Sequence, residues 1–466
     1  MVWVEGNINS TAPIRNISLS IKQKPVQLSR KFMKHPRLMQ NRLLVFFFTL
    51  ICFGAGFIKV FGQPVAAGFQ APPAATANDN EPRFQSRFAS STLHTQTHAA
   101  SAIELKDGRI RAFWFAGSRE GARDVEIRSA AFDPALGQWG AEQTVVTREG
   151  TQQSLLRYVS KLGNPVAGRA ADGTLWLYYV TVTLGGWAGS SITAMVSRDE
   201  GETWGAARRL VTSPFLNIST LVKGAPFFYG DGTMGLPVYH EFISKFGEIL
   251  HLDKNGAVQD KQRLTAGGSG ALQPVVLVKN SAEALVLLRY AGAATPYRAV
   301  VAASSDGGQH WAAPAKSALP NPNSALTAVV LPDGRILAVL NNQESGRDAL
   351  SLVISADGGS NWQTVYRLED QTGVRGQSPD ESAYLKTFAQ LAKETGVKAA
   401  DVGEYAGSAK RQVCAGQGCR FEFSYPYLIR AQSGDFHLVY TWNRSFIKHV
   451  AFNLAWLDQR PLGAGP

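Results

Sequence analysis

The chain has 466 residues, 45% of them hydrophobic, with 45 Gly, 22 Pro and 10 Trp, a composition that suits a turn-rich β protein with ample core. Its formal net charge of +11 is concentrated at the N-terminus, where residues 1–42 carry eight Lys or Arg side chains against Glu5 alone. A basic arm beside a hydrophobic run is typical of a membrane-targeting flank, so we expect no nucleic-acid partner. The sequence also lacks a phosphate-binding loop, a dinucleotide fingerprint and a cluster of metal ligands, and we expect neither a cofactor nor a metal.

The hydrophobic run covers residues 43–61 and predicts either a retained transmembrane anchor or the core of a signal peptide. Val65-Ala66-Ala67 offers a small-residue cleavage site for the second alternative. In both cases the rest of the chain is expected outside the cytoplasm, tethered to a membrane or secreted, and in the periplasm if the source is bacterial. Residues 62–89 contain a stretch rich in Ala, Pro, Gly and Asn and are expected to be a linker.

An octapeptide pattern, S-x-D-x-G-x-x-W, occurs three times, at 197–204, 304–311 and 355–362. The Ser and Asp side chains can bond the backbone of a tight turn, Gly can adopt a positive φ, and Trp folds back as an apolar plug. Degenerate copies centre on Asp133 and Asp253, so successive aspartates are 66, 54, 53 and 51 residues apart. This is the period of a four-stranded propeller blade.

A second repeat consists of an apolar strand, a turn and another apolar strand. Asp-Gly turns of this kind occur at 107–108, 172–173, 231–232 and 333–334, and weaker copies at 280–281 and 433–434. Asp-Gly between apolar runs is a strong hairpin signal, and six hairpins indicate six blades. The sequence therefore predicts an all-β fold, a six-bladed β-propeller over residues 90–458, followed by a tail at 459–466.

Residues 371–420 break the period and are expected to be an insertion entering blade six. Residues 380–398 have helical spacing, with Asp380 as the cap. Cys414 and Cys419 enclose a small loop that an oxidising compartment could close. Because consecutive strands are antiparallel, the tight turns share one end of the propeller, and the loops at the other end are where function is expected.

The repeated octapeptide resembles the Asp-box, or BNR repeat, of the sialidase superfamily, and the resemblance covers roughly residues 90–455. It implies an arginine cluster that holds a substrate carboxylate, a tyrosine nucleophile and an acid/base residue on a blade-one loop. Arg289 and Arg347 match two of the arginines, and Tyr425 stands at the position of the nucleophile. The blade-one loop carries Arg119 with Glu120 or Asp124 as the acid/base.

Further polar residues on the same loops are expected to line the pocket: Arg444, Gln273, His240, Glu241 and Asn323. Two positions depart from the family pattern. Residues 94–98, H-T-Q-T-H, stand where the first arginine is expected, and Gln273 stands where a glutamate would activate the tyrosine.

The sequence thus predicts a sialidase-like exo-glycoside hydrolase whose partner is a glycan or glycoconjugate with an acidic terminal sugar. The N-terminal segment adds a membrane as the second partner. The alternatives are a carbohydrate-binding propeller without catalysis, favoured by the two departures, and a membrane-tethered interaction module.

Overall fold

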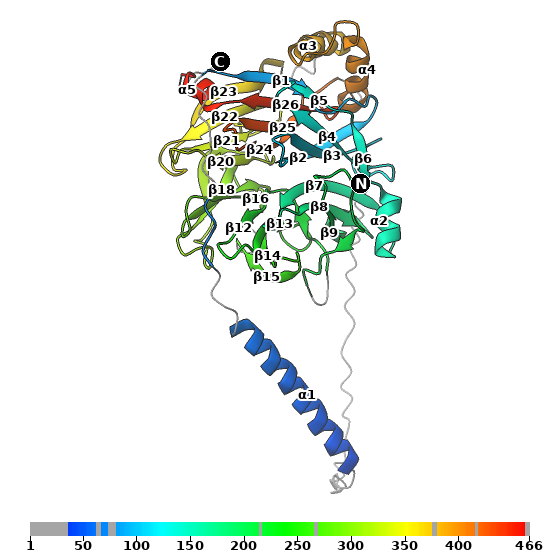
Figure 1. Cartoon of the computed structure of the whole chain (residues 1–466), viewed down its shortest axis with the longest axis vertical. Helices are drawn as coiled ribbons and strands as arrows, with labels where there is room; N and C mark the ends of the chain where they lie inside the picture. The colour runs from blue at the N-terminus through cyan, green and yellow to red at the C-terminus, as the bar shows by residue number, and fades with distance from the viewer. Residues whose placement is uncertain are drawn as a thin grey trace, which may run out of the picture. The chain divides into compact units, whose positions relative to one another are not determined.

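The computed structural model of the chain describes residues 36–61, 67–72, 81–213, 217–264, 269–374, 380–414 and 418–461. The chain divides into two compact units, Met1–Pro64 and Val65–Pro466. In the first unit the hydrophobic run is helical and belongs to α1 (Pro36–Phe61; Figure 1). No helix in the described ranges is both long and apolar enough to cross a membrane. The basic arm up to residue 35, residues 65–66 of the expected cleavage site and the end of the tail (462–466) lie outside the described residues.

The second unit is a six-bladed β-propeller, as predicted, and each blade is one antiparallel sheet. Blade one contains β2 (Gln96–Glu104), β3 (Ile110–Gly117), β4 (Glu126–Asp133), β5 (Gln138–Trp139) and β6 (Gln143–Val146), and blade two contains β7 (Lys161–Arg169), β8 (Leu175–Val182), β9 (Ser190–Ser197) and β10 (Arg208–Arg209). Blade three contains β11 (Leu221–Val222), β12 (Phe227–Phe228), β13 (Met234–His240), β14 (Phe246–Leu252) and β15 (Val258–Arg263), and blade four contains β16 (Ala271–Val278), β17 (Ala284–Tyr290), β18 (Arg298–Ser304) and β19 (Ala315–Pro320). Blade five contains β20 (Thr327–Val330), β21 (Ile336–Leu340), β22 (Ala349–Ser355) and β23 (Gln363–Asp370), and blade six contains β24 (Phe423–Arg430), β25 (Phe436–Trp442), β26 (Phe446–Phe452) and β1 (Phe84–Phe88).

Blade six is closed by a strand from the other end of the propeller sequence. β1 pairs antiparallel with β26 over five residues, from Phe84 opposite Phe452 to Phe88 opposite Lys448. The expected linker at 62–89 is therefore wrong at its C-terminal end, because the edge of β26 binds this segment as a fourth strand. Phe69, also in the expected linker, is 2% exposed and stacks on Tyr229 of blade three at 5.7 Å. The propeller therefore begins before residue 90.

The three octapeptide turns share one hydrogen-bond pattern. In the turn after β18, Ser304 Oγ donates to Asp306 Oδ1 at 3.0 Å, and Asp306 Oδ1 accepts from the backbone N of His310 at 3.0 Å. The turns at Ser197 and Ser355 repeat both contacts. Each turn joins the third and fourth strands of a blade. The aspartate oxygens thus satisfy amide donors that a tight turn would otherwise leave exposed.

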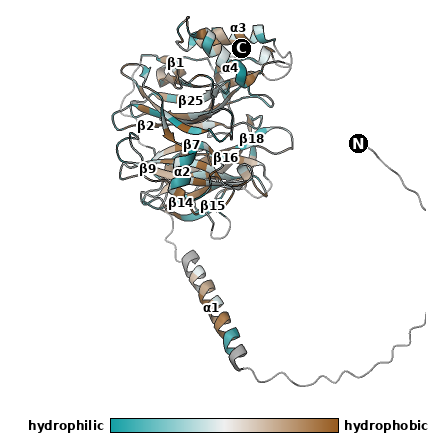
Figure 2. Ribbon diagram, turned by 90° about the vertical axis from the view of Figure 1, so that its right-hand side faces the viewer, coloured by the Kyte–Doolittle hydropathy of each residue, from teal (hydrophilic) through white to brown (hydrophobic). Residues whose placement is uncertain are grey.

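The insertion forms two helices, α3 (Glu381–Glu394) and α4 (Val402–Val413), of which only the first was predicted. As predicted, Asp380 caps α3 by accepting from the backbone N of Ala383 at 2.7 Å. Cys414 and Cys419 are joined by a disulfide. Both helices mix hydrophobic and hydrophilic residues in Figure 2, as expected for helices with one buried face. Tyr405 of α4 stacks on Phe88 of β1 at 5.9 Å, so the insertion packs on the flank of blade six.

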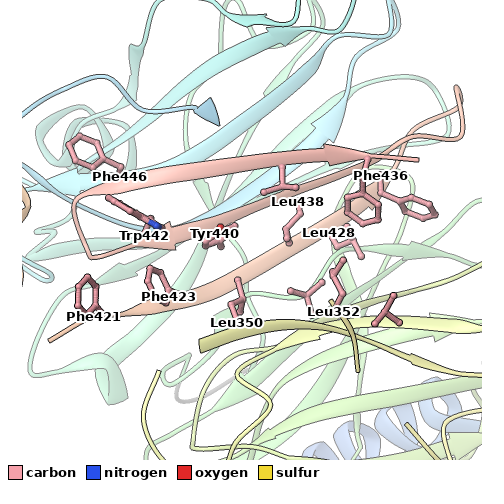
Figure 3. Packing of buried hydrophobic residues seen from close by; sticks show 14 of the residues in the cluster. Leu350, Leu352, Phe421, Phe423, Leu428, Phe436, Leu438, Tyr440, Trp442 and Phe446 are labelled. Carbon is pink, nitrogen blue, oxygen red and sulfur yellow. The ribbon is translucent and has the colours of Figure 1, made fainter. Parts of the chain in front are cut away.

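Shorter helices complete the described part: α2 (Arg148–Leu155), η1 (Trp187–Gly189), η2 (Thr372–Val374) and α5 (Leu454–Asp458). Aromatic and aliphatic side chains of blades five and six form a shared core, seen in Figure 3, in which Phe423, Tyr440 and Trp442 are fully buried. This core fixes the first strand of blade six, β24, which carries Tyr425 at its start.

Candidate functional site

One end of the propeller carries a ring of residues in left-handed backbone conformation. Each blade contributes one, with φ between 38° and 56°, at or just before its first strand: Ala99, Asn164, Ser219, Gln273, Asn323 and Tyr425. In β2, β7, β16 and β24 this position coincides with a bulge, where the register with the second strand shifts. Left-handed backbone costs a residue with a Cβ roughly 1–2 kcal/mol, and such strain gathers at functional sites. The ring marks the end of the propeller that the sequence predicted for function.

Tyr425, Arg289 and Gln273 form the centre of the candidate site. Arg289 Nη1 donates to Tyr425 Oη at 3.3 Å and to Gln273 Oε1 at 3.2 Å. The buried Gln273 amide donates through Nε2 to Tyr425 Oη at 3.5 Å and to Tyr239 Oη at 3.4 Å. Asn164 Nδ2 also donates to Tyr239 Oη, at 3.0 Å. Three residues predicted for one pocket, from β16, β17 and β24, are thus in direct contact.

Asn323 connects Arg289 to Arg347. Its side-chain Oδ1 accepts from Arg289 Nε at 2.8 Å, and its backbone carbonyl accepts from Arg347 Nη2 at 2.9 Å. The two arginines predicted to bind a carboxylate are therefore neighbours. Within the described part of the chain, Arg289 has no carboxylate at ion-pair distance, because its hydrogen-bond partners are an amide, a phenol and a second amide.

Glu422 lies on the other side of Arg347 and was not predicted as a site residue. Its Oε1 accepts from Arg347 Nη1 at 3.3 Å and from Ser424 Oγ at 2.8 Å, and its Oε2 accepts from Arg444 Nε at 2.6 Å. Burial by itself would raise the pKa of Glu422, but the arginines, Arg444 first, outweigh it and lower the pKa to about 2. The carboxylate is therefore ionised at physiological pH and holds two of the three site arginines.

Arg444 lies in the tight turn between β25 and β26, where it and Asn443 both have positive φ, 51° and 52°. Its Nη1 is 3.7 Å from Glu120 Oε2, so it bridges blade six and the loop of blade one. Burial alone would lower the pKa of Arg444, but the neighbouring carboxylates Glu422 and Glu120 raise it. Arg444 therefore supplies the third permanent cation of the site.

The blade-one loop brings only part of its predicted set to the arginines. Glu120 reaches Arg444, and its backbone N donates to Gln96 Oε1. Asp124 instead accepts two bonds from Ser118, from the backbone N and from Oγ, each at 2.9 Å, which closes its own loop. Arg119 is exposed, and its side chain bonds no other residue of the described ranges.

Glu241 and His240, predicted to line the pocket, differ in their surroundings. Burial raises the pKa of Glu241, the nearby Glu120 raises it further, and Arg289 opposes the change. His240 stacks on Phe246 at 4.7 Å with nearly parallel rings, and burial lowers its pKa. Glu241 therefore belongs electrostatically to the arginine cluster. Nowhere in the described ranges do three or more His, Cys, Asp or Glu side chains gather as a metal ion would require.

Two buried basic residues surround Tyr425. The His98 ring lies 4.3 Å from the Tyr425 ring, and burial lowers the pKa of His98 to about 3, so the imidazole is neutral. Lys223 is 4% exposed, lies 4.9 Å from the Tyr427 ring and has its pKa lowered to about 7 by burial. Lys223 and Tyr427 also line a cavity of about 430 Å³ that continues along β16, β20 and β24 and is not lined by the site arginines.

Two site residues, Glu422 and Tyr239, were missed by the sequence analysis. Glu422 lies two residues beyond the expected end of the insertion at 420, so it was counted with neither the insertion nor the site. A signal existed: Glu422 and Ser424 are two residues apart in extended chain and so share a side. Tyr239 directly precedes the predicted His240 and Glu241 and reads as a core residue of β13.

Comparison with known proteins agrees with this architecture. The BNR repeat-like domain family matches residues 108–438, which is more than half of the chain. No curated protein sequence matches.

Several solved structures share the fold. The Hadza microbial sialidase Hz136 superposes with a TM-score of 0.56 at 13% identity, covering 77% of this chain and 66% of that one. A protein of unknown function from Dyadobacter fermentans DSM 18053 gives 0.56 at 12% identity, with 79% and 98% covered. The NanB sialidase from Streptococcus pneumoniae gives 0.54 at 10% identity, with 85% and 72% covered. The chain belongs to the BNR repeat-like domain family and has the propeller fold of the sialidases.

Proposed function

We propose that this propeller is a sialidase-like exo-glycoside hydrolase that acts on a terminal acidic sugar outside the cytoplasm. The observation that carries the proposal is the hydrogen-bonded group of Arg289, Gln273 and Tyr425, with Arg347 held beside it through Asn323. A planar guanidinium grips a carboxylate with two parallel bonds. Arg289, whose partners are all neutral, anchors the carboxylate of the sugar. The Cys414–Cys419 disulfide supports a location outside the cytoplasm.

Tyr425 and the carboxyl pair take the chemical roles. Tyr425 attacks the anomeric carbon and gives its phenol proton to water, while the bond to the leaving oxygen breaks and that oxygen takes a proton from the carboxyl pair; alternatively, Tyr425 stabilises the positive charge that develops at the anomeric carbon. Arg289 Nη1 donates to the phenol oxygen at 3.3 Å and holds it in position. Glu120 and Glu241 lie within electrostatic range of each other, and burial raises the pKa of Glu241 above its ordinary value. A raised pKa is the direction of change that proton donation to a leaving oxygen requires, so we place the general acid in this pair.

A carbohydrate-binding propeller without catalysis is the second candidate, and Gln273 favours it. Its side chain occupies the place beside Tyr425 where a base would stand, and an amide cannot accept the phenol proton. His98, also next to Tyr425, is neutral because of burial and has little basicity left.

Hydrolysis decides between the candidates. Aryl glycosides of sialic acid, related ulosonic acids, uronic acids and neutral sugars are offered to the protein and to Arg289→Ala. The hydrolase predicts release from one acidic class and a fall in kcat/KM of about 100-fold or more in the variant. Arg123→Ala is the matched control, because Arg123 is an exposed arginine of the same blade-one loop that donates to Tyr158 Oη.

The binding module would be favoured if the wild type binds the sugar without hydrolysing it and Arg289→Ala no longer binds it. An unchanged Arg289→Ala protein in both assays would contradict both candidates and leave the interaction module.

A further inference from the structure

The carboxylate of Glu422 stands where two site arginines converge. It bonds Arg347 Nη1 at 3.3 Å and Arg444 Nε at 2.6 Å, and Ser424 Oγ fixes its orientation at 2.8 Å. Only 17% of the Glu422 side chain is exposed, so solvent screens these pairs weakly. The space between the guanidinium groups of Arg347 and Arg444, which we call the Arg347–Arg444 seat, is where a ligand carboxylate would bind if Glu422 did not fill it.

The three arginines therefore differ in what they can offer to an anion. Arg347 and Arg444 are already paired with an ionised carboxylate, and Arg444 has Glu120 as a second one at 3.7 Å. Among the described residues, Arg289 bonds only the neutral groups of Asn323, Gln273 and Tyr425. An incoming carboxylate meets one arginine that has no ion-paired carboxylate, Arg289, and, at the other two arginines, a like charge.

We infer that Glu422 is the specificity-determining residue of this pocket: it fills the Arg347–Arg444 seat from within, so that of the three site arginines only Arg289 is left to anchor an anionic ligand. The inference rests on the proposed function only in naming the ligand as a sugar. A substrate thus needs a single carboxylate at Arg289, and the pocket discriminates less strongly between an acidic sugar and its neutral counterpart than it would with the seat open.

Removing the charge of Glu422 opens the seat. Glu422→Gln keeps the size of the side chain and an oxygen that can accept from Ser424 Oγ, but it leaves Arg347 and Arg444 without their shared counter-charge. Unpaired buried charges are destabilising, so the variant melts at a lower temperature than the wild type. A small carboxylate that enters the seat restores the melting temperature by mass action.

Pyruvate is the probe for the seat itself, because it carries a carboxylate and no sugar. Calorimetric titration and thermal shift are run on wild type, Glu422→Gln, and Glu422→Gln combined with Arg444→Met. We expect Glu422→Gln to bind pyruvate about tenfold or more tightly than the wild type, and the double variant to lose that gain. Glu120→Gln is the matched control, since it removes a carboxylate at 3.7 Å from Arg444 but does not open the seat. Equal or weaker binding in Glu422→Gln would show that Glu422 only holds the arginines in place, and would overturn the inference.

The sugar arm uses the methyl α-glycoside of N-acetylneuraminic acid and its methyl ester, which differ by one charge. The ratio of their affinities should rise about tenfold in Glu422→Gln, because only the free acid gains the new seat. If Glu422→Gln fails to fold, single arginine variants replace it: Arg289→Met should weaken binding of the acid about tenfold more than Arg444→Met does. The reverse order overturns the inference.

The two proposals fail separately. If Glu422→Gln gains pyruvate binding but neither protein binds a sugar, the proposed function is contradicted and the inference about Glu422 stands. If the wild type hydrolyses an acidic sugar and Glu422→Gln binds that sugar more weakly, the proposed function stands and the inference about Glu422 is contradicted.

Discussion

Gln273 decides at the level of one residue what chemistry Tyr425 can perform. It is 2% exposed and bonds Arg289, Tyr239 and Tyr425 at once, so its amide is the polar centre of the site. A carboxylate in the same place would accept the proton of Tyr425 while still accepting from Arg289.

We therefore predict that Gln273→Glu gains hydrolytic activity toward the sugar acid that the wild type binds. General-base assistance is worth about 100-fold in rate, and the change should appear in kcat more than in KM. Single-turnover kinetics with an aryl glycoside measure it, and Tyr425→Phe in the Gln273→Glu background should abolish the gain. A gain that survives Tyr425→Phe would exclude Tyr425 as the group being activated.

The sequence predicted site residues such as Arg289, at the end of a strand, and Arg347, in the loop between two strands, because the order of the hairpins alone assigns both positions to one end of the propeller. The sequence could not show which of them touch. Asp124 turns to Ser118, a contact set by loop conformation, and His240 stacks on Phe246, its partner in the β13–β14 register. The bulge at Tyr425 also breaks the alternation that sequence reasoning relies on.

At the scale of elements, the repeated turn shows how one motif accommodates different residues. The residue after the aspartate has positive φ in all three copies: Glu200 at 61°, Gly307 at 74° and Gly358 at 74°. Glu200 offsets its strain through bonds from Arg169 Nη2 at 2.6 Å and Nη1 at 2.8 Å. The sequence predicted these turns because their geometry is local. It predicted α3 for the same reason but missed α4, although α4 is amphipathic as well.

We predict graded costs for alanine in the turn that follows β22. Gly358→Ala meets only the end of Lys279 at 3.3 Å and should lose about 1 kcal/mol from its positive φ. Gly359, with φ of 102°, would place a Cβ 2.8 Å from Leu285 Cδ2, so Gly359→Ala should lose about 2 kcal/mol or more. Gly407→Ala in α4 meets nothing within 4 Å and should gain about 1 kcal/mol. Urea unfolding gives the order, and equal costs at 358 and 359 would contradict it.

For the whole molecule, buried histidines set the stability in acid. His437 Nδ1 and His449 Nε2 are 3.0 Å apart between β25 and β26; burial lowers the pKa of His437 to about 4 and that of His449 well below its ordinary value. In the unfolded chain an imidazole has a pKa of about 6.5, so as the pH falls the unfolded chain takes up protons on His437 and His449 before the folded protein does. Stability is therefore complete above pH 6.5 and falls as the pH drops toward 4, by roughly 1.4 kcal/mol per histidine and pH unit.

Urea unfolding of the wild type and His449→Gln between pH 7 and pH 5 measures this term. In the variant, the free energy of unfolding should depend less on pH, by the contribution of one histidine. Glu248, which is buried, and Glu104 and Glu241, which are half-buried, have pKa values raised by burial and act in the opposite direction. The difference between the two proteins is therefore the test rather than either slope. Parallel slopes would place the acid sensitivity elsewhere.

The closure of the ring was the part of the fold that the sequence could not predict, because a five-residue strand far from its partner carries no repeat. β1 closes the ring by pairing with β26, and its aromatic side chains hold it there: Phe84 stacks on Trp456 at 4.6 Å, and Phe88 lies 4.9 Å from Phe446. The free energy of unfolding should therefore fall stepwise across three chains that begin at residues 65, 81 and 90. Starting at 81 loses the buried Phe69, about 2 kcal/mol, while starting at 90 also exposes the edge of β26 and should lose roughly 3–5 kcal/mol more. Equal stability of the chains from 81 and 90, measured by urea unfolding, would mean that the propeller closes without β1.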